Sequence, residues 1–132
     1  MWKYFVKDGP VPSKSGYEFK MLHSFEKRKA ESLRINEKYP DKIPLILERS
    51  DASHLPEIEK KKYLMQKDVT IGQFIFIIRK QIKINETESI FLLINNIVVP
   101  ATGATIGEMY EKHADKDGFL YITYSSQQTF GM

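Results

Sequence analysis

Between Thr70 and Ile82, apolar residues recur every three or four positions, which is the spacing of one face of an α-helix. Gln73 follows Thr70 at the distance of a capping box, so the helix is predicted to begin at Thr70. A helix with one apolar face lies across another apolar surface, and a sheet is the expected one. The stripe consists of Ile71, Phe74, Ile75, Ile78 and Ile82.

The residues before this helix alternate in character and predict a short strand at Lys62–Met65. Lys62 and Leu64 would share one face of that strand, and Tyr63 and Met65 the other. Core packing is the simplest interpretation of the helical stripe. Four apolar residues lie off the stripe, so part of this surface is also a candidate groove: Tyr63, Met65, Phe76 and Ile77.

The same patterns predict further elements on both sides of the helix. Ser24 is a suitable N-cap for a strongly charged helix whose apolar contacts would be Phe25, Leu33 and Ile35. The predicted elements are helices at Tyr17–Leu22 and Phe25–Lys38, strands at Lys42–Arg49, Ile90–Ile94, Ile97–Val99 and Phe119–Ser125, and a short helix from Thr105.

Pro44 lies within the predicted strand Lys42–Arg49. Proline has no N–H to donate to a neighbouring strand, which indicates local exposure of this one. From this strand onward the order is strand, strand, helix, strand, strand, helix, strand. We therefore expect an α+β fold with helices on one face of a mixed sheet.

The composition narrows the function classes. The chain has 132 residues, 42% hydrophobic and 28% charged, which suits one soluble domain. It has no cysteine, which excludes disulfides, thiol nucleophiles and cysteine-based zinc sites. No apolar run approaches a membrane span, and His23, His54 and His113 show no metal-ligand spacing. We expect no enzyme, no metal and no other cofactor, and a location in the cytosol or nucleus.

The charge is uneven along the chain. Residues 1–62 hold 14 Lys+Arg and 10 Asp+Glu, whereas residues 63–132 hold 6 and 7. The basic half indicates either an acidic partner or a solvated helix face. Nucleic acid is not an expected partner, because acidic residues are interleaved with the basic ones and no nucleic-acid motif is present.

The two ends differ from the middle. A run of Gly, Pro and Ser at 8–13 breaks regular structure, so residues 1–16 are predicted to be a flexible arm. Its aromatic segment Trp2–Val6 is a candidate contact for a membrane, a partner or the chain's own groove. Residues 17–125 hold the predicted domain, and residues 126–132 are a predicted flexible tail.

Several stretches, in family order from Tyr17 to the end, resemble the autophagy ubiquitin-like modifiers of the GABARAP kind. They are His23–Arg28, Lys38–Pro44, Lys60–Leu64, Val69–Phe74, Ile78–Lys80, Asn95–Asn96, Gly118–Ser125 and Phe130–Gly131. The resemblance implies a ubiquitin-like β-grasp with two additional N-terminal helices packed on the mixed sheet. The chain departs from the family at Ser24 and Gln66, where proline is usual, and at Gln81, where a basic residue is usual.

The resemblance implies a processed tail. A cysteine protease would cleave after Gly131, and activating and conjugating enzymes would join the new carboxylate to the headgroup amine of phosphatidylethanolamine. Glycine suits a narrow catalytic tunnel because it has no Cβ, and Phe130 would help to seat the tail. The lipid chains would hold the otherwise cytoplasmic domain on the autophagosome membrane.

The resemblance also implies a peptide groove along Lys62–Met65, for cargo receptors and autophagy proteins that carry an aromatic-x-x-aliphatic motif. The aromatic pocket would comprise Glu31, Ile35, Pro44, Ile46, Lys62, Leu64 and Phe119. The aliphatic pocket would comprise Tyr63, Met65, Val69, Phe74, Ile77 and Ile78. Acidic residues beside the motif would contact His23, Lys42, Lys60 and Lys61. Plain core packing remains the alternative for Ile46, Phe74 and Ile78.

A second hypothesis keeps the groove and omits the lipid. The chain would then be an interaction adaptor whose basic N-terminal half contacts an acidic partner such as tubulin. Phe130–Gly131 near the end of the sequence favours the lipid-conjugated modifier.

Overall fold

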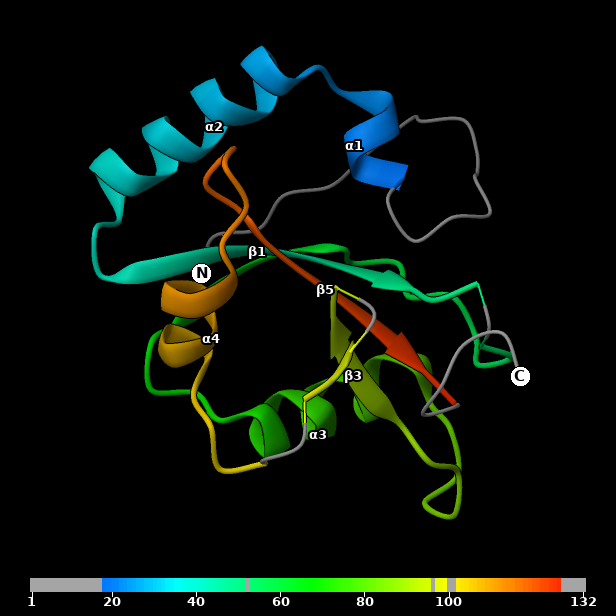
Figure 1. Ribbon diagram of the computed structural model, residues 1–132. Coiled ribbons are helices and arrows are strands. Elements are labelled where there is room, and N and C mark those ends of the chain that lie inside the picture. Colours follow the sequence, from blue (N-terminus) through cyan, green and yellow to red (C-terminus); the bar gives the residue numbers. More distant parts are fainter. Residues whose placement is uncertain (1–17, 52, 96, 100–101, 127–132) are drawn as a thin grey trace.

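A mixed β-sheet separates two layers of helices (Figure 1). The computed structural model describes residues 18–51, 53–95, 97–99 and 102–126. Within them the elements are α1 (Glu18–Leu22), α2 (Phe25–Lys38), β1 (Lys42–Arg49), β2 (Lys62–Gln66), α3 (Ile71–Ile82), β3 (Phe91–Ile94), β4 (Ile97–Val98), α4 (Ile106–His113) and β5 (Leu120–Ser125). The predicted arm, residues 1–16, lies outside the described part of the chain, as does the predicted tail, residues 126–132, except for Ser126.

The described strands form a sheet in the order β2-β1-β5-β3-β4. The two central strands β1 and β5 are parallel, and every other neighbouring pair is antiparallel. This arrangement confirms the predicted α+β β-grasp with two extra N-terminal helices. The prediction that all helices lie on one face is wrong: α1 and α2 cover one face, whereas α3 and α4 cover the other (Figure 1).

The helices begin where the sequence places their caps. The Ser24 side chain accepts a hydrogen bond from the Lys27 N–H at 3.2 Å and caps α2. Thr70 and Thr105 each complete a predicted capping box, with Gln73 and Glu108 as the respective partners. These contacts satisfy backbone N–H groups that a helix start leaves unpaired, which explains why local sequence alone locates the starts.

Alternation along β1 and β5 sends side chains into two separate cores. Leu45, Leu47 and Ile122 join a large core under α3 and α4. Ile46 and Tyr121 join a smaller one under α1 and α2. Both faces of these central strands are therefore buried, which a sheet covered by helices on one face would not show.

Strand β1 is an inner strand, so the predicted exposure around Pro44 is wrong. The Leu47 N–H donates to the Lys61 carbonyl at 2.8 Å, so the N–H groups of odd-numbered residues in β1 point toward β2. The nitrogen of Pro44 points the other way, toward β5. Pairing with β5 begins only at Leu45, so proline removes no sheet hydrogen bond.

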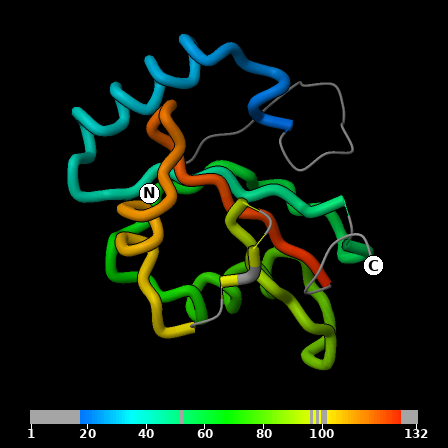
Figure 2. The backbone as a smooth tube through the Cα atoms, in the orientation of Figure 1, coloured from blue at the N-terminus to red at the C-terminus, as the bar shows by residue number. Residues whose placement is uncertain are grey.

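Helix α2 buries little apolar surface. Of its predicted apolar contacts only Ile35 is buried, whereas Phe25 and Leu33 are 44% and 51% exposed. Ser32 is the other buried residue of the helix. Hydrogen bonds from Lys29 and Ser32 to backbone carbonyls of the segment between α4 and β5 hold the helix in place. Figure 2 shows this segment reaching up to α2.

Candidate functional site

Strand β2 forms an edge of the sheet, and half of its backbone groups face outward. The Lys61 carbonyl accepts a hydrogen bond from β1, and backbone N–H and C=O groups alternate in direction along a strand. The backbone groups of the odd-numbered residues of β2 therefore also point toward β1. The N–H and C=O groups of Lys62 and Leu64 therefore point to the open edge, as does the N–H of Gln66, whereas the Gln66 carbonyl accepts a hydrogen bond from the Val69 N–H. An extended peptide can pair with such an edge as an additional strand.

On one face of this edge, the predicted aromatic-pocket residues come together under α1 and α2. Ile35, Ile46 and Phe119 belong to one buried cluster, and Leu64 packs against it half-buried. Pro44 is buried opposite Leu64. Two further members of the cluster, Phe19 and Tyr121, are not among the residues predicted from the sequence. For Tyr121 a signal existed, since alternation places it on the same face as Phe119.

Lys62 and Glu31 form the polar side of this cluster. The Lys62 Nζ lies 4.0 Å from Glu31 Oε2 and 4.7 Å from the centre of the Phe19 ring. Burial lowers the pKa of Lys62 to about 7. At neutral pH the amine is therefore only partly protonated, and it lies against a carboxylate and an aromatic face.

On the opposite face, the predicted aliphatic-pocket residues divide into core and rim. Tyr63, Met65, Phe74 and Ile78 are buried in the large core, and the groove role of Tyr63 and Met65 stays a prediction. Val69 and Ile77 are partly buried against the same core. The Tyr63 hydroxyl is buried and lacks a hydrogen-bond partner within the described structure.

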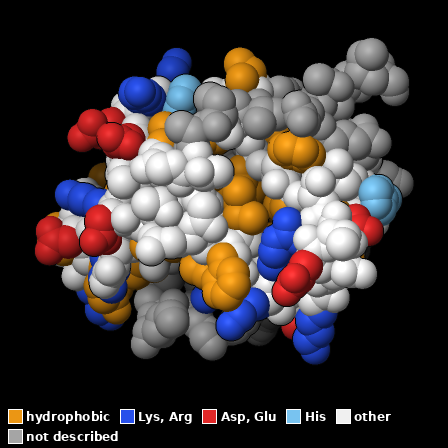
Figure 3. Space-filling model, turned by 90° about the horizontal axis from the view of Figure 1, so that it is seen from below, with side chains coloured by type: hydrophobic (Ala, Val, Ile, Leu, Met, Phe, Trp, Pro, Cys, Tyr) orange, Lys and Arg blue, Asp and Glu red, His pale blue; other side chains and the backbone are white. Residues whose placement is uncertain are grey.

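A shallow hollow of about 660 Å³ adjoins this rim. Phe76 contributes to it and is 58% exposed, in agreement with its position off the helical stripe. Figure 3 views the molecule from the side of α3 and shows apolar side chains beside basic ones. The lining consists of Val69, Thr70, Gly72, Gln73, Phe76, Ile77 and Thr102.

The four predicted basic contacts do not form one patch. Lys60 and Lys61 lie at the start of the β2 edge, and Lys61 pairs with Glu18 on α1 at 3.3 Å. His23 packs on Phe19 of the same helix, with ring centroids 4.7 Å apart. Lys42 lies opposite Gln66 at the other end of the edge. That end is about 17 Å away at 3.4 Å per residue, so one acidic flank cannot reach both ends.

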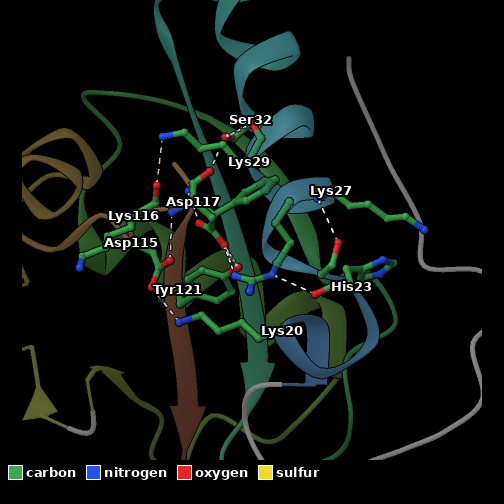
Figure 4. A network of polar contacts seen from close by, with 12 residues as sticks. Lys20, His23, Lys27, Lys29, Ser32, Asp115, Lys116, Asp117 and Tyr121 are labelled. Carbon is green, nitrogen blue, oxygen red and sulfur yellow. Dashed lines mark hydrogen bonds and ion pairs between the residues drawn. The ribbon is translucent and has the colours of Figure 1, made fainter.

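A network of ion pairs and hydrogen bonds fixes α1 and α2 over the sheet (Figure 4). Asp117 is fully buried and accepts hydrogen bonds from Arg28 Nη1 at 2.6 Å and from the Tyr121 hydroxyl at 2.5 Å. The Ser32 hydroxyl donates to the Asp117 carbonyl. Lys20 pairs with Asp115 at 2.7 Å. Part of the basic half is thus neutralised within the molecule.

Gly118 closes the turn that presents Asp117 to α2. Its φ of +95° lies in the region that favours glycine, and a Cβ there would come within 2.9 Å of Ser32 Cβ. The sequence predicts a turn at Asp115–Gly118. It does not predict that the turn anchors helix α2.

Glu48 holds α1 from the sheet side. The residue is 4% exposed, and its carboxyl group accepts a hydrogen bond from the Phe19 N–H at 2.8 Å. Burial raises the pKa of Glu48 to about 7, against the opposing effects of the Phe19 hydrogen bond and of Lys61. Because Phe19 belongs to the buried cluster with Ile35 and Phe119, Glu48 helps to position one side of that cluster.

We expect Glu48 to make the protein less stable as pH rises from about 4.5 to about 7. The unfolded carboxyl ionises in this range while the buried one stays protonated, so unfolding becomes more favourable by up to about 3 kcal/mol. Urea unfolding of the wild type and of Glu48→Gln at several pH values measures the effect. The difference between the two free energies of unfolding should change across this range. Parallel pH profiles would refute the assignment.

Within residues 18–51, 53–95, 97–99 and 102–126, no helix is both long and apolar enough to cross a bilayer. In the same ranges, no three His, Asp or Glu side chains gather closely enough to hold a metal ion. Asp115 and Asp117 bind Lys20, Arg28 and Tyr121 instead.

Comparison with known proteins gives one consistent family. Residues 27–131 match the family described as "Autophagy protein Atg8 ubiquitin like". Autophagy-related protein 8 of Schizosaccharomyces pombe is 54% identical over 114 residues, covering 86% of this chain and 93% of the relative. Autophagy-related protein 8e of Arabidopsis thaliana is 53% identical over 116 residues, covering 88% and 94%. The crystal structure of Trypanosoma brucei ATG8 superposes with a TM-score of 0.78 at 36% identity, covering 86% of this chain and 97% of that one.

Proposed function

Because the chain belongs to the Atg8 family of ubiquitin-like autophagy proteins, we propose that it tethers motif-carrying partners to a membrane as a lipid-conjugated modifier. The partners are cargo receptors and autophagy proteins with an aromatic-x-x-aliphatic motif. The protein binds and is modified, and it is not itself an enzyme. It is cytoplasmic before conjugation and bound to the autophagosome membrane afterwards.

The observation that carries motif binding is the placement of two apolar clusters on opposite faces of one open edge. Residues three apart in a strand point to opposite faces of a sheet. An added strand with an aromatic residue and an aliphatic residue at this spacing reaches both clusters. The first lies beside Leu64 and the second beside Val69 and Ile77.

The order of the clusters along β2 sets the direction of the bound strand. The aromatic cluster lies beside Lys62 and Leu64, whereas the aliphatic rim lies beside Met65 and the turn after it. A motif that enters with its aromatic residue first therefore runs parallel to β2. Its acidic N-terminal flank then meets Lys60 and Lys61, and its C-terminal flank passes Lys42. Such short motifs bind with Kd of about 1 μM, or roughly −8 kcal/mol.

The proposed attachment to the membrane depends on processing and conjugation of the C-terminal tail, which the family membership supports. Cleavage after Gly131 exposes a carboxylate, which is activated and then joined to the amine of phosphatidylethanolamine. Each buried CH₂ of the acyl chains contributes roughly 0.8 kcal/mol, so two chains anchor a domain of this size. The tail itself lies outside the described residues, and its role rests on Phe130 and Gly131 in the sequence.

Intact-mass spectrometry of the protein from membrane and soluble fractions tests this function. The membrane fraction should contain a species that lacks Met132 and carries the mass of phosphatidylethanolamine, and Gly131→Ala should remove that species. Unmodified full-length protein in both fractions, under conditions that induce autophagy, would instead support a non-lipidated adaptor. Binding to tubulin would then be the next measurement.

A further inference from the structure

The chain that follows β1 packs around the end of β5, where the predicted C-terminal tail begins. The Ser50 N–H donates to the Tyr124 carbonyl at 2.9 Å, and the Tyr124 hydroxyl donates to the Pro56 carbonyl at 2.6 Å. The His54 N–H donates to Ser126 Oγ at 3.4 Å, one residue beyond the end of β5. Segments 72 positions apart in the sequence therefore meet at the first residue of the tail.

The backbone on both sides of His54 is fixed by contacts that do not involve its side chain. Arg49 Nη1 donates to the Ser53 carbonyl at 3.2 Å and to the Leu55 carbonyl at 3.1 Å. The Leu55 N–H donates to Ser53 Oγ at 3.0 Å, and both of these residues are buried. His54 itself is exposed. Replacing its side chain should therefore leave the fold intact.

The His54 ring lies between the start of the tail and the segment before β3. Its Nδ1 lies 3.1 Å from Ser126 Oγ, and its Nε2 lies 3.6 Å from Glu88 Oε1. A carboxylate beside Nε2 favours the tautomer that carries the hydrogen there, which leaves Nδ1 as an acceptor. The Ser126 hydroxyl then donates to Nδ1 while its oxygen accepts the His54 N–H. His54 thus satisfies both the donor and an acceptor site of this serine.

These contacts determine where the tail leaves the domain. The sheet pairing of β5 ends at Ser125, opposite Phe91, and the contacts with His54 extend the fixed backbone to Ser126. Gly131 follows Ser126 by five residues. At about 3.4 Å per residue it lies at most about 17 Å from Ser126. An enzyme that acts on the Gly131 carbonyl must therefore approach the domain close to His54.

We propose that His54 is a positioning residue for processing of the tail, because it holds Ser126 so that the tail enters the processing protease from a fixed origin. The proposal rests on the function proposed above and adds to it a residue outside the tail. A tail that is already fixed at its first residue loses less conformational freedom when it enters the enzyme. The contact acts on binding of the tail and not on cleavage of the peptide bond, so it changes KM and leaves kcat unchanged.

Cleavage kinetics of the full chain with its purified processing protease test the proposal, with the release of Met132 followed by mass spectrometry. His54→Ala should raise KM about three- to fivefold at unchanged kcat, the loss expected for one hydrogen bond. Ser126→Ala should raise KM by a similar factor. The double variant should have no higher KM than either single variant, because both changes remove the same contact. Circular dichroism melting curves establish that each variant is folded.

Two conservative replacements separate the two contacts of the ring. Asparagine places an amide near the position of Nδ1, so His54→Asn should keep KM within about twofold of wild type. Glutamine places its amide near the position of Nε2, so His54→Gln should behave like His54→Ala. His113→Ala is the matched control, because it removes an exposed histidine at the end of α4 and should leave KM unchanged.

An unchanged KM in both His54→Ala and Ser126→Ala would overturn the proposal and leave the proposed function intact. Additive effects in the double variant would also overturn it, since the two side chains would then act separately. A lower kcat at unchanged KM would place the effect in the chemical step and contradict a positioning role. If the wild type is not cleaved at all, the proposed function fails and this inference fails with it.

Discussion

Replacing Asp117 with alanine is expected to lower the free energy of unfolding by about 3–5 kcal/mol. The carboxylate is fully buried and is the acceptor for Arg28 and Tyr121. It also accepts the Phe119 N–H at 2.9 Å. Its removal leaves a guanidinium, a hydroxyl and an amide without this acceptor in a region of low dielectric, which costs more than the loss of the contacts themselves.

Asp115→Ala is the matched control, because Asp115 lies in the same turn and also forms an ion pair. Both partners of its pair with Lys20 are about 30% exposed, at 28% and 32%. Solvent screens such a pair, so the expected loss is about 1 kcal/mol or less. Urea unfolding of both variants provides the measurement. Equal losses would show that the buried pair between Arg28 and Asp117 does not anchor α2.

The Asp117 variant should also bind motif peptides more weakly, even at temperatures where it is folded. Phe19 and Ile35 reach the aromatic cluster from α1 and α2, and the network around Asp117 fixes both helices. Loss of these contacts should therefore weaken both the packing of α1 and α2 on the sheet and the affinity for the peptide. An unchanged peptide affinity in the folded variant would show that the affinity does not depend on these contacts.

The second large effect is expected from Leu64→Arg, which should weaken motif binding by about 100-fold, or roughly 3 kcal/mol. Leu64 lies half-buried at the mouth of the aromatic cluster, on the strand that would pair with the peptide. Arginine removes an apolar contact and places a charge that a bound aromatic residue would desolvate. In the unbound protein the guanidinium can extend from the sheet edge into solvent, so stability should change little.

Ile97→Arg is the control for this effect. Ile97 is 70% exposed on β4, the edge strand at the other end of the sheet. The same change of charge and size there should leave the peptide affinity within about twofold of wild type, since the two sites share no contact. A circular dichroism spectrum and melting curve establish that both variants are folded. Similar affinities of the two variants would overturn the placement of the groove at β2.

Local sequence determined the elements of this fold. The caps at Ser24, Thr70 and Thr105 and the stripe of α3 locate helices because their contacts are formed within one or two turns. Alternation along β1 and β5 likewise places Ile46 and Leu47 on opposite faces. Both signals depend on residues a few positions apart, so they are readable without the fold.

The sequence predictions that are wrong concern residues whose surroundings are formed by segments far along the chain. Pro44 indicates exposure locally, yet pairing with β5 begins one residue later and its missing N–H has no consequence. Leu33 is apolar and yet 51% exposed, whereas Ser32 is buried because the carbonyl of Asp117 lies beside it. No local pattern contains these contacts, since the two residues are 85 positions apart.

In the candidate site, too, some features follow from local sequence and others from contacts between distant segments. The sequence by itself indicated the family and the four-residue core of the edge strand, and alternation placed Ile46 and Leu47 on opposite faces. Only the tertiary structure decided that the pockets lie on opposite faces of one open edge, that Lys42 is separated from Lys60 and Lys61, and that Phe76 opens a further hollow. The physical reason is that side-chain direction follows from short-range periodicity, whereas neighbourhood and exposure depend on which distant segments the sheet order and helix docking bring together.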